Sequence, residues 1–271
     1  MDWLQAVILG ILQGITEFLP ISSSGHLVVL QSWLGIEEHD LAFDLVAHLG
    51  TLLSVLTVYH RLVRRLTIEA LSFPLKRKMT PEIQLMGLVF IASLPTALMG
   101  FFFKDFYTGL FSSLRAVGFL FILTGGLLLL TRGKGGDDSR LELDNLQGLS
   151  LITWKKALLI GVAQGVSIAP GISRSGATIA TALLAGLPKN TAAMFSFMMA
   201  IPAILGASFL ELKDVDWTQV SASALFVGFI VSYVSALVGL KVILHVVRKG
   251  RLELFTGYLW LLGIVVVIWS F

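Results

Sequence analysis

Residues 13–25 read QGITEFLPISSSG, and residues 164–176 repeat the pattern without a gap as QGVSIAPGISRSG. Both stretches begin with Gln-Gly and end with Ile-Ser-x-Ser-Gly. Two of the positions at which they differ involve a charge. Glu17 of the first copy is an isoleucine in the second, and Arg174 of the second copy is a serine in the first. We therefore expect a chain of two related halves, one carrying a carboxylate and the other a guanidinium.

The composition is that of a membrane protein. Apolar residues make up 56% of the chain and charged residues only 14%. An all-α polytopic membrane protein is expected, since a helix needs about 20 apolar residues to cross about 30 Å of hydrocarbon. The absence of cysteine excludes disulfides, thiolate metal sites and thiol nucleophiles. Spanning helices are predicted at residues 42–60, 83–103, 115–131, 191–210, 219–241 and 254–271.

The net charge of +3 is explained by where the cations lie along the chain. Three connections between predicted helices are rich in Lys and Arg, whereas the intervening ones, such as residues 37–40, have few or none. By the positive-inside rule, the three rich connections are expected in the cytoplasm. Their cations are Arg61, Arg64, Arg65, Lys76, Arg77 and Lys78; Arg132, Lys134, Arg140, Lys155 and Lys156; and Lys241, Arg248, Lys249 and Arg251.

Each repeated stretch is too interrupted to span the bilayer. In the second copy the apolar runs 157–170 and 176–187 are short, so each reaches only roughly 20 Å at 1.5 Å per residue. Lys156 and Lys189, which flank this element, both fall in cytoplasmic positions. We expect a re-entrant hairpin that turns at Pro170 to Gly176, and a first hairpin, turning at Pro20 to Gly25, that opens to the outer face.

These elements predict an inverted-topology repeat in a single membrane domain, residues 1–271. Each half is a re-entrant helical hairpin plus three transmembrane helices: repeat one covers residues 1–131, a cytoplasmic linker residues 132–154, and repeat two residues 155–271. Such an architecture brings two broken-helix tips together near the midplane. Non-helical backbone at that depth is tolerated where it lines a wet cavity, so we expect a polar cavity between the tips.

The serine-rich turns at the two tips are typical of anion sites. Each precedes a half-helix whose free N–H groups favour negative charge. The alternative is that the serines only cap helices and the glycines only permit tight turns. Two copies that converge inside the membrane favour the anion site.

Arg174 and Glu17 are the charged residues of the tips. A guanidinium in the bilayer is costly unless it meets an anion or water, and its fork suits phosphate oxygens. Glu17 follows Gln13 by four residues, so both lie on one helical face. A carboxylate indicates a reaction or a metal, because an anion site alone gains nothing from it. The alternative for both residues is a mutual ion pair.

Two histidines are further candidates. His26 directly follows the first tip, where it could act as an acid, a base or a nucleophile, or simply pack. Asp44 and His48, four residues apart on the next helix, are expected to line or support the cavity, with direct ligation as the alternative.

Residues 13–26, QGITEFLPISSSGH, and residues 170–178, PGISRSGAT, closely resemble the two signature motifs of the undecaprenyl-diphosphate phosphatase family, also called the bacitracin-resistance phosphatases. The resemblance covers essentially the whole chain. It implies an integral membrane hydrolase that removes the terminal phosphate of undecaprenyl diphosphate, a C55 isoprenoid lipid, and so recycles the lipid carrier for peptidoglycan and cell-wall synthesis. It also implies a divalent metal, Mg²⁺ or Ca²⁺, with Glu17 as the ligand.

The resemblance further implies catalytic importance for Glu17, His26 and Arg174. One departure matters: many members carry a second glutamate where this chain has Gln13, which cannot act as a base, so Glu17 would do the essential carboxylate work. Whether water, a serine or His26 attacks the phosphorus stays open. The predicted substrate-binding residues are Gln13, Ser22, Ser23, Ser24, Gly25, Ser173, Ser175, Gly176 and Thr178.

A polyprenyl-phosphate flippase, alone or combined with the phosphatase, is the competing function, because inverted repeats are common among carriers. The expected partners are the lipid diphosphate and the bilayer, with no nucleic acid. Small residues such as Gly125 and Gly126 could pack helices within one chain or between the two chains of a homodimer. The expected location is the bacterial cytoplasmic membrane, with the active site open to the outer face.

Overall fold

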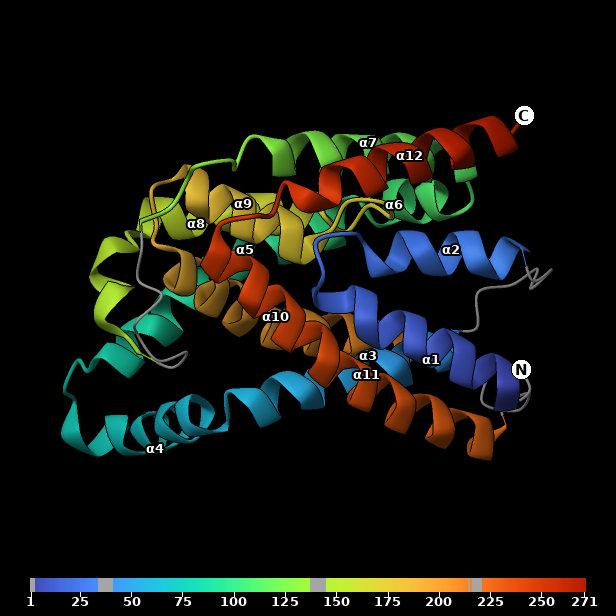
Figure 1. The fold of residues 1–271 in the computed structure, drawn as a ribbon. Coiled ribbons are helices and arrows are strands. Elements are labelled where there is room, and N and C mark those ends of the chain that lie inside the picture. The colour runs from blue at the N-terminus through green and yellow to red at the C-terminus, as the bar shows by residue number, and fades with distance from the viewer. Residues whose placement is uncertain (1–2, 34–40, 137–144, 214, 216–220) are drawn as a thin grey trace.

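The computed structural model describes residues 3–33, 41–136, 145–213, 215 and 221–271. In these ranges the chain is all-helical and contains no strand (Figure 1). The twelve α-helices are α1 (Trp3–Phe18), α2 (Ser23–Trp33), α3 (Leu41–Val58), α4 (His60–Lys76), α5 (Pro81–Phe102), α6 (Lys104–Phe111), α7 (Leu114–Leu129), α8 (Trp154–Val166), α9 (Arg174–Leu184), α10 (Lys189–Glu211), α11 (Ala222–Lys249) and α12 (Leu254–Trp269), with a 3-10 helix, η1 (Gln147–Leu151).

The apolar helices make the chain a multi-pass membrane protein. Helices α3, α5, α10 and α11 are long and apolar enough to cross a bilayer, and α6 with α7, bent by 100°, makes a fifth span if the pair counts as one. Each of the six predicted spanning segments coincides with one of these helices or with α12. Helices α7 and α12 have only 16 residues each, about 24 Å at 1.5 Å per residue, and so fall short of a full crossing.

The two repeated stretches form helical hairpins, as the sequence predicts. Helices α1 and α2 run antiparallel and are joined by residues 19–22, and α8 and α9 are joined by residues 167–173. The hairpins enter from opposite ends of the molecule, and their tips meet in its middle (Figure 1). The backbone turns through left-handed conformations at Ser22, with φ 68°, and at Gly171, with φ 100°. At Gly171 a Cβ would lie 2.6 Å from the carbonyl oxygen of Val117, so only glycine fits there.

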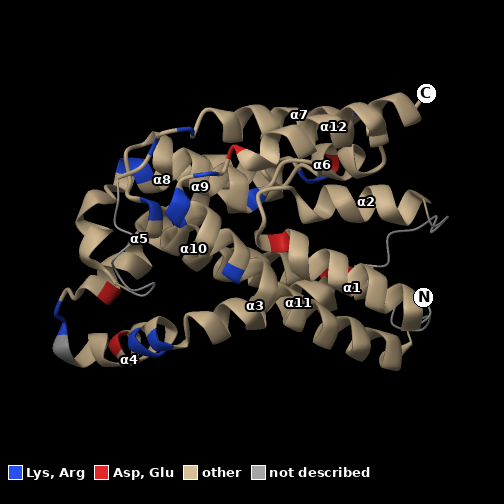
Figure 2. Cartoon of the chain, viewed as in Figure 1, with Lys and Arg blue, Asp and Glu red and all other residues tan. Residues whose placement is uncertain are grey.

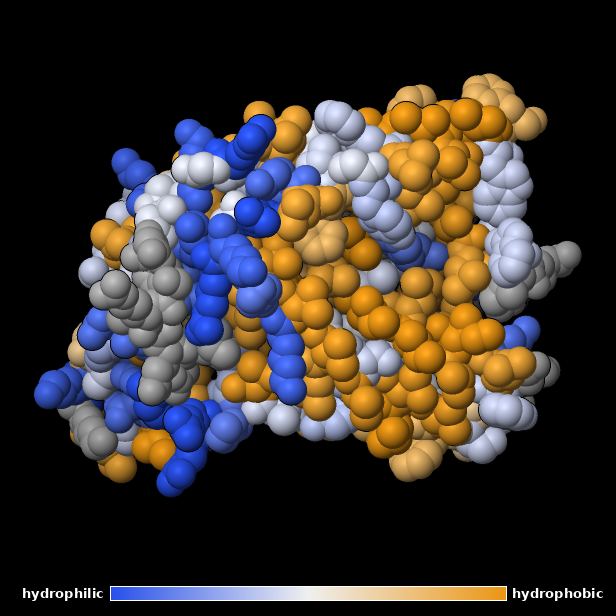
Figure 3. Space-filling view, in the orientation of Figure 1, coloured by the Kyte–Doolittle hydropathy of each residue, from blue (hydrophilic) through white to orange (hydrophobic). Residues whose placement is uncertain are grey.

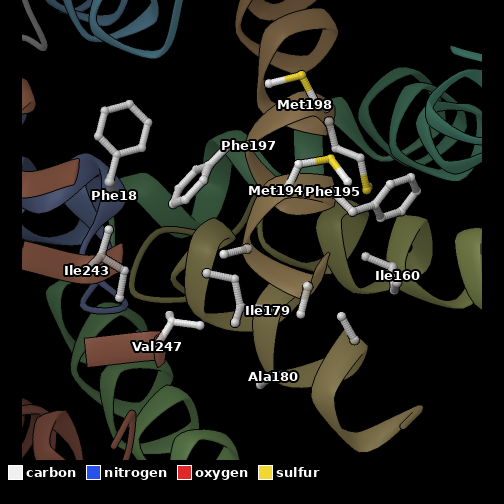
Figure 4. Packing of buried hydrophobic residues seen from close by; sticks show 14 of the residues in the cluster. Phe18, Ile160, Ile179, Ala180, Met194, Phe195, Phe197, Met198, Ile243 and Val247 are labelled. Carbon is white, nitrogen blue, oxygen red and sulfur yellow. The ribbon is translucent and has the colours of Figure 1, made fainter. Parts of the chain in front are cut away.

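Helix α10 passes beside both tips, and its buried side chains form a large part of the hydrophobic core. In Figure 4 its Phe197 points toward Phe18 at the end of α1, and Phe195 points toward Ile160 of α8. The rings of Phe18 and Phe197 meet edge to face with centroids 5.7 Å apart, and both side chains are fully buried. Because lipid tails are as apolar as these side chains, close packing rather than water exclusion stabilises the contact.

Most of the cations gather at one end of the molecule, around α4, the start of α8, the start of α10 and the end of α11 (Figure 2). The same end is the hydrophilic part of the surface, while the rest of that face is largely apolar (Figure 3). The structure therefore brings the cation-rich segments of the sequence to one side. Two assigned segments, residues 37–40 and residues 137–144 of the linker, which include Arg140, lie outside the described residues.

One part of the topology differs from the expectation. The sequence predicts a cation-rich connection from Arg61 to Lys78, whereas helix α4 begins at His60 and covers this segment up to Lys76. Leu62 on this helix is fully buried, whereas Arg61, Arg64 and Arg65 are exposed. The helix forms because apolar residues recur on one face; the high content of arginine hides that period when the segment is judged by hydropathy alone.

Small residues pack helices within the chain. A Cβ at Gly125 would lie 2.8 Å from the Trp260 ring of α12, whereas Gly126 has open space on its free side. Gly125 therefore serves the contact between α7 and α12, and a homodimer stays a prediction.

Candidate functional site

The centre of the site is Glu17, in the last turn of α1. Three side chains donate to its buried carboxylate: Arg174 Nη2 to Oε1 at 2.5 Å, Ser23 Oγ to Oε2 at 2.6 Å and Gln13 Nε2 to Oε2 at 2.9 Å. A fourth group, His48 Nε2 on α3, lies 3.7 Å from Oε2. The expected shared face of Gln13 and Glu17 is confirmed. A carboxylate held by so many donors keeps its charge and its orientation.

Arg174 begins α9 and reaches Glu17 across the gap between the two hairpins. The mutual ion pair is thus present, as one interpretation of the sequence expected. The pair occupies only one of the terminal nitrogens. Arg174 Nη1 is buried and has no hydrogen-bond partner among the described residues. Since a buried guanidinium N–H without a partner is costly, this atom is suited to an incoming anion.

Three of the serines hold the tips against each other. Ser22 Oγ accepts from the backbone N–H of Gly171 at 3.0 Å, and Ser173 Oγ and Ser175 Oγ donate to the carbonyl oxygen of Leu19 at 3.4 and 3.1 Å. Ser22 and Ser173 also cap their helices. All three side chains are buried, so their hydroxyls are engaged in holding the backbone of the site.

The remaining predicted binding residues divide into two kinds. Ser23 and Ser24 are only partly buried and lie at the first turn of α2. Gly25 and Gly176 permit close approach: a Cβ at Gly25 would lie 2.8 Å from the Gly171 nitrogen, and one at Gly176 3.1 Å from Pro20. Thr178 donates to the Arg174 carbonyl at 2.8 Å and lies 2.6 Å from the hydroxyl of Ser196, so it supports the start of α9.

His26 is buried one turn along α2 and does not contact Glu17. Its Nδ1 lies 2.8 Å from the Ser22 carbonyl oxygen and its Nε2 lies 2.6 Å from the Tyr258 hydroxyl on α12. Its ring is stacked on Tyr258 and meets the edge of Phe121. Ser23 and His26 are three residues apart on one helix, so their side chains are neighbours.

Sequence reasoning gave too little weight to His48 and missed Tyr258. The sequence predicts that Asp44 and His48 line or support the cavity. In the structure His48 Nδ1 lies 2.7 Å from the backbone carbonyl oxygen of Asp44, and Nε2 on the far side of the ring faces Glu17. Tyr258 is 232 residues from His26 in the chain. A lone tyrosine in an apolar helix gives no local signal, and only the packing of α12 reveals it.

The donor set limits how a metal could bind. The described residues hold no group of three His, Cys, Asp or Glu side chains placed to bind one ion. Glu17 stands as a single carboxylate whose oxygens already accept from neighbours. The residues therefore fit an ion held mainly by the phosphate oxygens of a ligand with one protein carboxylate, as Mg²⁺ often is, and not a cage preformed by the protein.

Comparison with known proteins identifies relatives over almost the whole chain. The chain is 38% identical to a protein of Halothermothrix orenii named undecaprenyl-diphosphatase, over 99% of this chain and 98% of that one. A protein of the same name from Carboxydothermus hydrogenoformans is 40% identical over 99% of this chain and 97% of its own length. One from Methanosphaera stadtmanae is 35% identical over 100% of this chain and 99% of its own.

A family model gives the same answer. Residues 6–265 match the family described as bacitracin resistance protein BacA, a range that includes both repeated stretches and every residue around Glu17 described above. The chain therefore belongs to the bacitracin resistance protein BacA family.

Proposed function

We propose that this protein is a membrane phosphatase that hydrolyses undecaprenyl diphosphate to undecaprenyl phosphate and inorganic phosphate. The observation that carries the proposal is Glu17, held between Arg174 of the second hairpin and Ser23 of the first. A carboxylate, a guanidinium with an unused nitrogen and a hydroxyl meet at one point. These are the groups that phosphoryl transfer needs: a base, a charge clamp and a nucleophile.

Arg174 would bind the terminal phosphate. Its free Nη1 can take one phosphate oxygen while Nη2 stays on Glu17, or the whole fork can turn to the phosphate. The first helical turns of α2 and α9 add partial positive charge from the ends of the hairpins. Ser22, Ser173 and Ser175 would act by fixing these turns, and Ser23 and Ser24, which are only partly buried, would be the hydroxyls that touch the substrate.

Ser23 is the nucleophile that this geometry favours over water or His26. Its hydroxyl already donates to Glu17 Oε2 at 2.6 Å. In the first step Ser23 Oγ forms a bond to the terminal phosphorus while its proton moves to Glu17, and the bond to the bridging oxygen breaks. Undecaprenyl phosphate leaves and takes the proton from Glu17 on its new phosphate oxygen, so Glu17 is again a carboxylate. In the second step water attacks the phosphoserine and gives a proton to Glu17, the bond between phosphorus and Ser23 Oγ breaks, and Glu17 returns that proton to Ser23 Oγ as phosphate leaves. Positioned acid–base groups contribute about 10²–10⁴-fold to such steps.

Glu17 is the residue that would hold a divalent ion, Mg²⁺ or Ca²⁺, together with the diphosphate. A bound ion would neutralise charge on the phosphate oxygens. Gln13 would keep the carboxylate oriented through its hydrogen bond to Oε2.

The site would open to the outer face of the bacterial cytoplasmic membrane, with the cation-rich end in the cytoplasm. The gathering of Lys and Arg at one end supports this orientation. An inverted repeat is supported by a reciprocal exchange of contacts: α1 of the first half packs on α11 of the second, and α8 of the second packs on α5 of the first. The polyprenyl tail would then lie among apolar helices while the diphosphate reaches the tips.

The alternative, a polyprenyl-phosphate flippase, is not favoured, since the relatives carry the name of a hydrolase. The proposal is tested by measuring phosphate release from isoprenoid diphosphates of several lengths, with and without a chelator, using purified full-length protein. Release from the C55 diphosphate that stops with chelator supports the reaction and its metal. No release from any diphosphate, with and without added Mg²⁺ or Ca²⁺, would refute the reaction.

A further inference from the structure

We infer that Tyr258 is a positioning residue for the reaction: its hydroxyl fixes the tautomer and the orientation of the His26 ring. This inference rests on the proposed function, in which His26 lies beside the nucleophile. It concerns a residue of the last helix that neither repeated stretch contains.

The two contacts of the imidazole determine its protonation. The carbonyl oxygen of Ser22 can only accept, so Nδ1, 2.8 Å away, carries a proton. Among the described residues the hydrogen-bond partners of His26 are a carbonyl oxygen and a phenol, not a carboxylate, and the ring is buried, which favours a neutral imidazole. Nε2 therefore has a lone pair that accepts from the Tyr258 hydroxyl at 2.6 Å. Tyr258 thus keeps Nε2 as the basic nitrogen.

The ring is also held in place by two aromatic side chains. Tyr258 stacks on it with centroids 5.8 Å apart and planes 12° from parallel, and Phe121 of α7 meets it edge-on at 5.1 Å. On the remaining side the ring is tied to Ser22, whose hydroxyl binds the second tip at Gly171. The orientation of His26 is thereby coupled to the junction of the two hairpins.

Tyr258 is itself firmly positioned by its helix. Two residues before it, Thr256 Oγ1 donates to the carbonyl of Gly125 at 2.9 Å, and two residues after it, Trp260 Nε1 donates to the carbonyl of Ile122 at 3.1 Å. Both acceptors belong to α7, the helix that also supplies Phe121. Helices α7 and α12 therefore present Phe121 and Tyr258 to His26 as one rigid unit.

The exposure of Tyr258 suggests how His26 becomes available. Tyr258 is 46% exposed while His26 is 8% exposed. Rotation of the phenol about its own side-chain bonds, with α12 held in place on α7, would free the lone pair of Nε2, and the ring would already be in the correct tautomer. No proton needs to leave the tyrosine for this role.

The test is the conservative change Tyr258→Phe in the full-length protein, with Tyr233→Phe as a matched control. Tyr233 is also a helix tyrosine whose hydroxyl meets one other hydroxyl, Thr57, away from the site. Loss of one hydrogen bond predicts that Tyr258→Phe lowers kcat about tenfold. We expect KM to stay within about twofold, because the phenol does not bind the phosphate in the resting contact. Tyr233→Phe should match the wild type in both.

Two further measurements separate positioning from a general effect on the fold. In the double variant with His26→Gln, the tyrosine change should lower kcat no further, because it acts through the histidine. In ring-labelled protein, the ¹⁵N shifts of His26 should show a protonated Nδ1 and an accepting Nε2, and Tyr258→Phe should shift the Nε2 signal.

The inference is overturned if Tyr258→Phe keeps the kcat of the control, if the two changes multiply, or if His26 is protonated at Nε2 in the wild type. Absence of phosphate release by the wild type would count against the proposed function instead. In that case the nitrogen shifts still decide whether Tyr258 sets the tautomer.

Discussion

At the scale of single residues, the site is one carboxylate with donors from three helices. Glu17 takes hydrogen bonds from α1, α2 and α9, and His48 of α3 lies just beyond hydrogen-bond distance. Each donor removes freedom from the carboxylate, and an oriented charge needs no reorganisation during the reaction. The chemistry is therefore expected to respond sharply to changes of a few atoms.

Removing the Ser23 hydroxyl tests the nucleophile. Ser23→Ala should lower kcat at least 10²-fold, because no other hydroxyl donates to Glu17 among the described residues. Substrate carrying ³²P in its terminal phosphate should label the wild-type protein in acid-quenched reactions and leave the variant unlabelled. The control is Ser221→Ala, at the exposed start of α11, which should retain the wild-type kcat and should still be labelled with ³²P. A variant with alanine at position 23 that turns over at the wild-type rate would assign the attack to water or His26.

Changing His48 tests the support of Glu17. His48→Ala should lower kcat about tenfold with little change in KM, because it leaves Glu17 less firmly oriented without touching the phosphate. His60→Ala is a close control. Like His48, His60 has its Nδ1 next to a backbone carbonyl oxygen, that of Thr57 at 2.9 Å, but His60 lies at the exposed start of α4. The measurement is the steady-state kcat of both variants. Equal kcat values would mean that His48 is not needed to orient Glu17.

At the scale of elements, the two tips are joined by serines and by glycine backbone. Gly171→Ala should destabilise the protein by about 1–3 kcal/mol, since alanine must adopt a left-handed φ with its Cβ against a carbonyl. The melting temperature in detergent should fall. Gly126→Ala, in a helix with open space beside it, should leave it unchanged or slightly higher. If both variants melt alike, the tip does not depend on this turn.

The same elements show what sequence alone could and could not predict. The hairpins and the meeting of Glu17 with Arg174 follow from a motif that occurs twice with complementary charges. The use of Ser22, Ser173 and Ser175 between the tips could not be foreseen, because an anion site and a helix cap require the same residues.

Contacts between helices that are distant in the chain could not be predicted from the sequence either. Tyr258 reaches His26 only because α12 packs on α7, and nothing within the sequence of α12 specifies that partner. Helix α4 was not predicted for a simpler reason. Its arginines lower the mean hydropathy of the segment, although apolar residues recur at helical spacing along one face.

At the scale of the whole molecule, the distribution of cations predicts the orientation in the membrane. The chain has no cysteine, so single cysteines can report sidedness directly. Trp33→Cys, at the end of α2 away from the cations, should react with a membrane-impermeant maleimide in intact cells. Leu75→Cys, on exposed α4, should react only after the membrane is opened. The reverse pattern would place the cation-rich end outside.

The proposed chemistry depends most on the pair of Glu17 and Arg174, which joins the two halves. One measurement tests it directly: phosphate release from undecaprenyl diphosphate by purified wild-type, Glu17→Gln and Arg174→Ala proteins at saturating divalent metal. The wild type should release phosphate, and each variant should fall at least 10²-fold, because one loses the base and the other the charge clamp. Turnover near the wild-type rate in either variant would contradict the role proposed for the residue that it replaces.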